Sequence, residues 1–211
     1  PYDDEKPVHK VRLTHDYYMG ETPVTQSLWR AVMNDNPSSF GEGGEGSYED
    51  DWEELPAENV SWDDCQRFIR KLNRMTGKRF RLPTEAEWEF AARGGNESCG
   101  YQYSGDDYID EVAWYGDNSD GETHPVKELD PNELGIYDMS GNVWEWCQDW
   151  YGAYSSSSQT NPKGPASGSG HVLRGGGWGS GAGYCRLSCR CYIYPDFTNS
   201  DLGFRLALSE L

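Results

Sequence analysis

The sequence predicts an α+β fold, with helices early in the chain and strands late. Capping residues and apolar periodicity agree on three helices before residue 95, whereas glycine, aspartate, asparagine and short alternating apolar runs dominate after it. The 211 residues suit one large domain, and aromatic residues make up 14% of them, enough for a folded core. We therefore expect a single domain spanning residues 1–211, with an aromatic-rich core and long connections.

Each predicted helix begins at a residue whose side chain can cap a helix N-terminus. Thr25 begins the first helix, TQSLWRAVM, and Ser61 begins the second, SWDDCQRFIRKLNRMT, which Gly77 ends. Thr84 is followed three residues later by Glu87, and this pair forms the capping box of a third helix. All three stretches carry apolar residues at helical spacing, so we expect each to bury one face.

The later half of the chain predicts short strands separated by loops. The runs HVLRGG (171–176) and GFRLALS (203–209) alternate or cluster apolar residues as strands do. Two stretches, 41–51 and 154–170, are rich in glycine and serine and poor in apolar residues, so we expect them to be flexible.

Composition excludes two classes of partner. The formal net charge of −18 produces a surface field that repels nucleic-acid phosphates and anionic lipid headgroups. No apolar run approaches the roughly 18 residues that a membrane span needs, so we expect no direct membrane insertion by this domain. The six cysteines are too few and too unevenly spaced for a disulfide framework.

Four motifs carry a resemblance to a known family. RLPTEAEWEFAARGG, GIYDMSGNVWEWCQDWY, VLRGGGW and LGFRLA occur in that order, and the match extends over nearly the whole chain. The sequence therefore resembles the formylglycine-generating enzyme (sulfatase-modifying factor) family. This resemblance implies a C-type-lectin-like fold with a small twisted antiparallel sheet, flanking helices and much irregular loop.

The catalytic cysteines that the resemblance implies are incomplete. Family members that oxidise a cysteine to formylglycine carry two copper-binding cysteines five positions apart after the RGG turn, and these positions fall here on Ser180 and Cys185. A serine hydroxyl cannot replace a thiolate ligand of a soft metal ion. We expect no enzymatic activity and no catalytic cofactor. The alternative is a copper-dependent formylglycine-generating enzyme or a related thiol oxidase.

Residues 179–201 lack five residue types. The stretch contains no Lys, Glu, Gln, Met or Trp, although these account for 42 of the 211 residues. Such an omission arises by chance in fewer than about one case in a hundred. Asparagine codons AAC and AAT whose adenines are replaced at random always end in C or T, and no codon ending in C or T encodes any of the five. Random adenine replacement therefore explains the omission.

This pattern is similar to that of proteins diversified by a retroelement, in particular the TvpA-type variable proteins of diversity-generating retroelements. The resemblance implies a variable ligand-binding region over 174–205, in which Cys185, Arg186 and Arg190 belong to a fixed set of positions. The positions that fit random adenine replacement are the predicted ligand contacts. They are Gly179, Ser180, Gly181, Tyr184, Cys189, Cys191, Tyr192, Ile193, Tyr194, Phe197, Asn199, Ser200 and Asp201.

The resemblance also implies a structural calcium site in DMSGNVWEW. Its ligands would be the side chains of Asp138 and Glu145 and the backbone carbonyls of Gly141 and Val143, all oxygen donors as calcium requires. The alternative is a buried salt bridge between Glu145 and an arginine such as Arg174, with no metal.

We therefore expect a non-enzymatic display protein that binds a protein or another surface ligand. Tyrosine with glycine, serine and asparagine is the composition of antibody binding surfaces, which supports this expectation. We expect a monomer at the cell surface or outside the cell, and the family resemblance suggests a lipid anchor in a segment absent from this chain.

Overall fold

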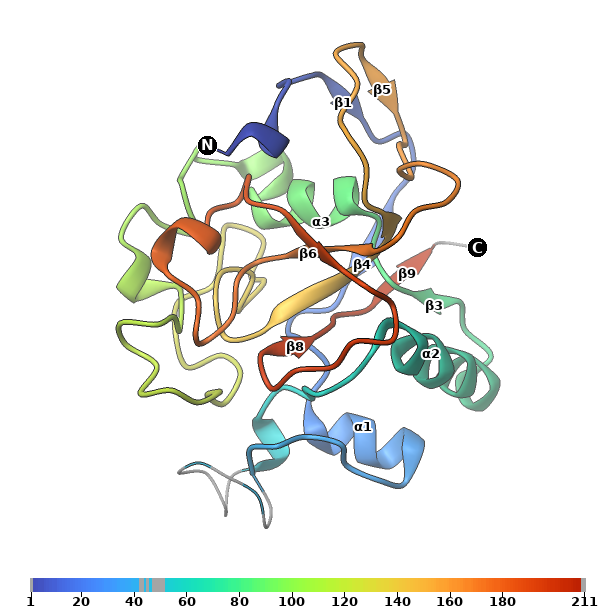
Figure 1. Cartoon of the computed structure of the whole chain (residues 1–211), viewed down its shortest axis with the longest axis vertical. Helices are drawn as coiled ribbons and strands as arrows, with labels where there is room; N and C mark the ends of the chain where they lie inside the picture. Colours follow the sequence, from blue (N-terminus) through green and yellow to red (C-terminus); the bar gives the residue numbers. More distant parts are fainter. Residues whose placement is uncertain (1, 42–43, 45, 47–51, 210–211) are drawn as a thin grey trace.

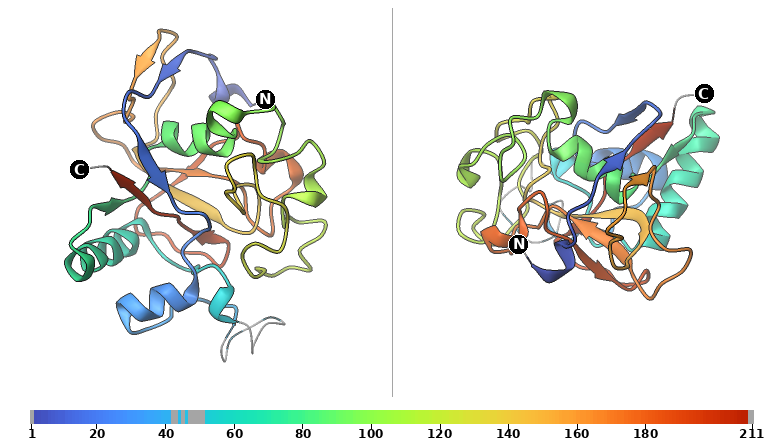
Figure 2. Two further views of the ribbon diagram at one scale, coloured as in Figure 1. Left: turned by 180° about the vertical axis from the view of Figure 1, so that it is seen from behind. Right: turned by 90° about the horizontal axis from the view of Figure 1, so that it is seen from above.

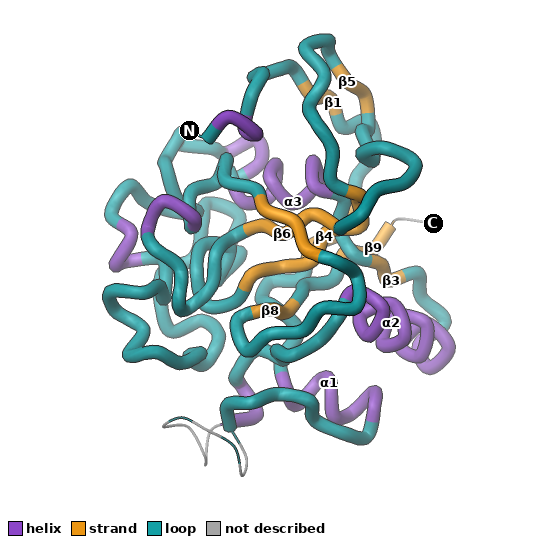
Figure 3. Tube along the Cα trace, viewed as in Figure 1, coloured by secondary structure: helices purple, strands orange, loops and turns teal. Residues whose placement is uncertain are grey.

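The computed structural model of the chain describes residues 2–41, 44, 46 and 52–209 (Figure 1). The stretch 41–51, predicted to be flexible, lies largely outside these residues. Helices and short strands are joined by long loops, which make up much of the fold (Figure 3). The α+β class predicted from the sequence is confirmed.

The described residues contain three α-helices, α1 (Gln26–Met33), α2 (Trp62–Thr76) and α3 (Glu85–Ala92). Their predicted N-caps are confirmed, because the side chains of Thr25, Ser61 and Thr84 each accept a hydrogen bond from a backbone N–H of the first turn. Gly77 ends α2 in the left-handed conformation, with φ of 70°. Glu87 completes the capping box of α3.

Nine strands are found in the described residues, and they form three sheets. They are β1 (Val11–Arg12), β2 (Tyr17–Met19), β3 (Phe80–Arg81), β4 (Trp144–Trp150), β5 (Gln159–Thr160), β6 (His171–Arg174), β7 (Cys191–Ile193), β8 (Leu202–Gly203) and β9 (Ala207–Ser209). The strand orders are β1-β5, β2-β9-β3 and β7-β6-β4-β8. The rear view shows β2 beside β9, which joins the two ends of the chain (Figure 2).

Two strand pairs depart from the antiparallel sheet that the sequence predicts. The β1–β5 and β4–β8 pairs are parallel. Parallel neighbours need a long connection, and the loops between these strands provide one. The stretch 154–170, expected to be flexible, contains β5 and is therefore partly held by β1.

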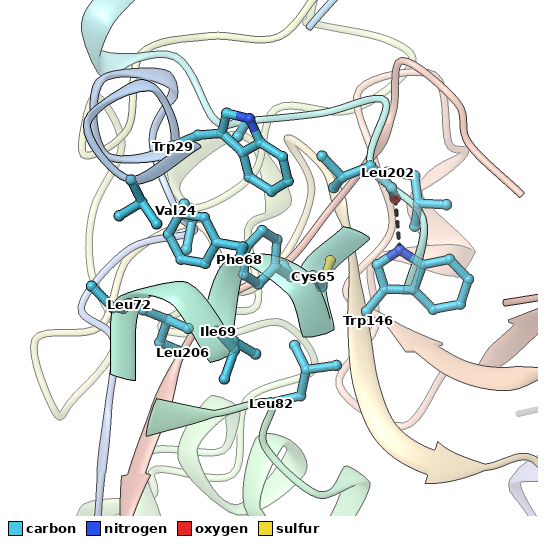
Figure 4. Close-up of a cluster of buried hydrophobic side chains, with 14 of the residues drawn as sticks. Val24, Trp29, Cys65, Phe68, Ile69, Leu72, Leu82, Trp146, Leu202 and Leu206 are labelled. Carbon is cyan, nitrogen blue, oxygen red and sulfur yellow. Dashed lines mark hydrogen bonds between the residues drawn. The ribbon is translucent and has the colours of Figure 1, made fainter. Parts of the chain in front are cut away.

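The sheet containing β4 separates two hydrophobic layers. Trp146 and Leu173 lie opposite each other on one face and pack with α1 and α2. Figure 4 shows this cluster, in which Trp146 Nε1 donates a hydrogen bond to the carbonyl of Val60 at 2.9 Å. Cys147 and Val172 lie on the other face and pack with α3. The sheet is therefore covered on both faces at β4 and β6, and its edge strand β7 pairs with β6.

Candidate functional site

Four aromatic side chains of the predicted variable region are exposed. The exposed fractions are 46% for Tyr184, 47% for Tyr192, 63% for Tyr194 and 42% for Phe197. Exposed apolar side chains that gather in one region often mark a binding surface. Tyrosine in particular offers a wide contact area at a low cost in side-chain entropy. These rings are the centre of the candidate site.

Strand β7 explains how one short segment serves both the core and the surface. Side chains alternate along a strand, and here Cys191 and Ile193 pack against the main core while Tyr192 faces outward. Tyr192 is supported from behind by Tyr151, whose ring stacks on it with centroids 4.3 Å apart. The strand therefore presents a predicted contact side chain on a backbone that is paired with β6.

Eleven of the thirteen predicted contact residues are exposed or half-buried, and we call this set the variable surface, in which Cys191 and Ile193 are half-buried and also pack against the core. Its members are Gly179, Gly181, Tyr184, Cys191, Tyr192, Ile193, Tyr194, Phe197, Asn199, Ser200 and Asp201. A Cβ atom added at Gly179 or Gly181 would meet no other atom within 4 Å. Larger side chains therefore fit at these two positions.

Ser180 and Cys189 correct the sequence prediction, because both are buried. Ser180 is 9% exposed, and its hydroxyl accepts a hydrogen bond from the N–H of Gly177 at 3.0 Å. Cys189 is 1% exposed and closes a turn in which its N–H donates to the carbonyl of Arg186. A codon pattern reports which residue types occur but not which way their side chains point, so the sequence could not separate these two from the others.

Arginines of the predicted fixed set hold the backbone of the variable surface. Arg186 binds both carboxylate oxygens of Glu5, at 2.6 and 3.0 Å. Arg190 binds both carboxylate oxygens of Glu85, at 2.7 and 2.8 Å, and its guanidinium lies 3.9 Å from the ring centre of Tyr154. Paired hydrogen bonds of this kind fix geometry as well as charge.

A third arginine ties the same loop to α3. Arg174 is fully buried, contacts Glu85 at 3.2 Å and Glu89 at 2.6 Å, and donates to the carbonyl of Leu187 at 2.7 Å. The acidic partners of these arginines, Glu5, Glu85 and Glu89, lie in the N-terminal half of the chain. Side chains on the variable surface can therefore change without loss of the contacts that hold its backbone.

Cys185 lies in the core, as its assignment to the fixed set predicts. It is 1% exposed and packs with Tyr103, Val112 and Tyr115. Burial raises the pKa of the Cys185 thiol to about 12, so the reactive thiolate is disfavoured at neutral pH. Among the described residues, no group of three or more His, Cys, Asp or Glu side chains is arranged to hold a metal ion.

Glu145 forms a buried ion pair, and its partner is Arg205 instead of Arg174. Arg205 contacts the two carboxylate oxygens of Glu145, each at 2.7 Å, and both residues are at most 1% exposed. Trp88 Nε1 donates a further hydrogen bond to Glu145 at 2.6 Å. The guanidinium of Arg205 therefore neutralises the charge of this buried carboxylate.

The calcium site stays a prediction, and one of its predicted ligands, Glu145, is engaged by Arg205 in this structure. Of the four predicted ligands, only Asp138 and Glu145 have a carboxylate side chain. The guanidinium of Arg205 already binds the carboxylate of Glu145. Burial raises the pKa of Asp138 to about 6, and its Oδ2 accepts a backbone N–H at 3.1 Å. The buried salt bridge of the alternative is present at this turn, with Arg205 in place of Arg174.

Glu58 is a buried acid that the sequence analysis missed. It is 0% exposed, its Oε1 accepts hydrogen bonds from the backbone N–H groups of Ser39 and Phe40, and its Oε2 has no partner in the described residues. Burial raises the pKa of Glu58 to about 8, and the nearby Asp201 carboxylate adds to the rise. The side chain thus favours its neutral form near neutral pH.

We predict that Glu58→Gln stabilises the protein at pH 8 but not at pH 4. The pKa in the folded state lies above the ordinary 4.5, so the contribution of Glu58 to stability is present below pH 4.5 and is lost as the pH rises to about 8. Glutamine stays neutral, so Tm should rise by several degrees at pH 8 in thermal unfolding. The exposed Glu53→Gln serves as control, and an equal gain at both pH values would contradict the prediction.

A separate hollow of about 1240 Å³ lies between α3 and the segments that contain β1 and β5. Its lining includes Val11, Phe90 and Tyr154, and none of the thirteen predicted contact residues. The candidate site therefore occupies an open surface, distinct from this hollow.

A family model described as "Sulfatase-modifying factor enzyme 1-like domain" matches residues 2–210. The chain belongs to this family. A member from Streptomyces coelicolor named formylglycine-generating enzyme is 39% identical over 72% of this chain and 52% of the relative. The chain thus spans about half the length of that enzyme. A relative from Paenibacillus barcinonensis named chaperone protein LppX is 33% identical over 92% of this chain and 81% of the relative.

Solved structures confirm the C-type-lectin-like fold predicted within the sulfatase-modifying factor family. Treponema denticola variable protein 1 is similar with a TM-score of 0.88 and 39% identity, covering 96% of this chain and 87% of that chain. The U1 variant of the major tropism determinant has a TM-score of 0.53 at 15% identity, covering 92% of this chain and 50% of that chain, so it shares the fold alone. No helix in the described residues is long and apolar enough to cross a membrane.

Proposed function

We propose that this family member is a non-enzymatic display protein whose C-terminal region, 174–205, is diversified by a retroelement to bind varied partners. The observation that carries the proposal is the position of the exposed aromatic rings, which stand on a backbone held by buried and half-buried arginine–glutamate pairs. A diversified binding site needs this separation, because random substitutions are tolerated only where they do not remove structural contacts.

The similarity to Treponema denticola variable protein 1 supports the proposal, since the two chains are 39% identical and match over almost their whole length. The partner would be a protein or another surface ligand, bound by the monomer. We place the protein at the cell surface or outside the cell, with lipid anchoring through a segment outside this sequence as the attachment.

The enzyme alternative is a copper-dependent formylglycine-generating or related thiol oxidase. It is favoured by the 39% identity to a formylglycine-generating enzyme. It is opposed by Ser180 at the first cysteine position and by the buried, high-pKa thiol of Cys185. With Ser180 at the first position, the pair of thiolate ligands that the family's copper chemistry uses is incomplete.

Sequencing the locus in sibling copies and related isolates tests the proposal. We expect differences confined to the variable surface and to the buried positions Ser180 and Cys189, with no Lys, Glu, Gln, Met or Trp among the replacements. A near-copy template beside a reverse transcriptase gene should accompany them. Scattered differences and no such template would contradict diversification. Aerobic conversion of a cysteine peptide by the copper-loaded protein, lost in Cys185→Ser, would favour the enzyme instead.

A further inference from the structure

Two side chains converge over Gly177 beside the variable aromatic rings. A Cβ atom added at Gly177 would lie 3.0 Å from Cβ of Asp201 and 3.3 Å from Cδ1 of Trp144. The N–H of Trp144 donates to the carbonyl of Asp201 at 2.7 Å, which fixes the two residues relative to each other. Both side chains are half-buried. They come from β4 and from the loop before β8, so only the folded chain brings them together.

Tyr184 adds an exposed aromatic wall to this pair. Its ring centre lies 6.2 Å from that of Trp144, and the ring planes meet at 64°. On its other side Tyr184 stacks on Tyr2, with centroids 5.7 Å apart. Trp144 thus neighbours both Tyr184 and Asp201. Aromatic rings near a carboxylate attract an organic cation, because the ring faces carry partial negative charge.

The carboxylate of Asp201 has no cationic partner among the residues that the structure describes. Its Oδ1 accepts a hydrogen bond from the amide of Asn199 at 2.6 Å. Arg186 and Arg190, the arginines of the same region, are engaged by Glu5 and Glu85. Burial raises the pKa of Asp201, so the charged form gains from any cation that reaches it.

We propose that Trp144, Tyr184 and Asp201 form a cation subsite, which receives a lysine or arginine side chain of the protein partner. This inference rests on the proposed function and specifies the partner chemistry. The net charge of −18 draws a basic partner toward the surface from a distance. A divalent metal ion is a poor occupant, because the subsite offers one carboxylate and two ring faces instead of a set of oxygen ligands.

Selection from a displayed library of random peptides tests the subsite. The wild-type chain is expected to enrich peptides in which lysine and arginine are at least about twice as frequent as in the unselected library. A synthetic copy of the most enriched peptide should bind Asp201→Asn about 10-fold more weakly than the wild type, since a cation–π contact and a charged hydrogen bond contribute on this order. Asp196→Asn, which removes an exposed carboxylate of the same loop, is the matched control.

A second peptide completes a double-mutant cycle between the protein and the peptide. Replacing its lysine or arginine by norleucine should weaken binding to the wild type about 10-fold and should not weaken binding to Asp201→Asn further. Enriched peptides without basic residues, or equal effects of Asp201→Asn and Asp196→Asn, would overturn the subsite while leaving the binding function in place. The double variant Tyr194→Ser/Phe197→Ser, which lacks two exposed aromatic rings, is selected in parallel. If the wild type enriches no peptides beyond those that this variant enriches, the proposed function fails and the subsite fails with it.

Discussion

Replacing Arg205 by methionine is expected to lower the free energy of unfolding by about 3–5 kcal/mol, as breaking one side of a buried ion pair does. The substitution leaves Glu145 charged at 1% exposure, with Trp88 Nε1 as its remaining side-chain donor. It also removes the guanidinium donors to the carbonyls of Gly20, Tyr137 and Asp138. The loss is a large part of the 5–15 kcal/mol that typically stabilises a domain.

Urea unfolding followed by tryptophan fluorescence measures this effect, and Arg67→Met is the control. Arg67 pairs with Asp64 on the surface and is 61% exposed, so its loss should cost at most about 1 kcal/mol. The double variant Arg205→Met/Glu145→Gln should recover part of the stability, because no unpaired charge then remains buried. Equal losses for Arg205→Met and Arg67→Met would show that the pair has no structural role.

The double variant Tyr194→Ser/Phe197→Ser is expected to lose binding while keeping its stability. Both residues are exposed, at 63% and 42%, and surface changes of this kind usually alter stability by less than about 0.5 kcal/mol each. If the two rings anchor a partner, their removal should weaken binding at least about 100-fold, since anchor residues contribute about 2 kcal/mol or more each. Affinity is measured with a peptide enriched on the wild type.

Tyr18→Ser is the control, because it removes an exposed tyrosine outside the variable surface. Tyr18 is 61% exposed and lies on β2, in the sheet that joins the chain ends. We expect its substitution to leave affinity unchanged. If Tyr18→Ser weakens binding as much as the double variant does, the contact surface lies elsewhere and the assignment of the variable surface is wrong.

The strand β4 shows why part of the fold could not be predicted. It is the longest strand, but Glu145 and Asp149 interrupt its apolar pattern at buried positions. A buried charge is tolerated only with a partner, and for Glu145 this is Arg205, sixty positions along the chain. The sequence around β4 does not show that Glu145 has a partner, and it therefore predicts no buried strand there.

The sequence by itself determined the features that depend on neighbouring residues. Thr25, Ser61 and Thr84 cap their helices through contacts within one turn, and the residue types missing from 179–201 predict a variable segment. The tertiary structure alone decided which variable positions face solvent and brought Trp144 and Asp201 together over Gly177. These outcomes depend on packing between residues distant in the chain, and local composition carries no record of such contacts.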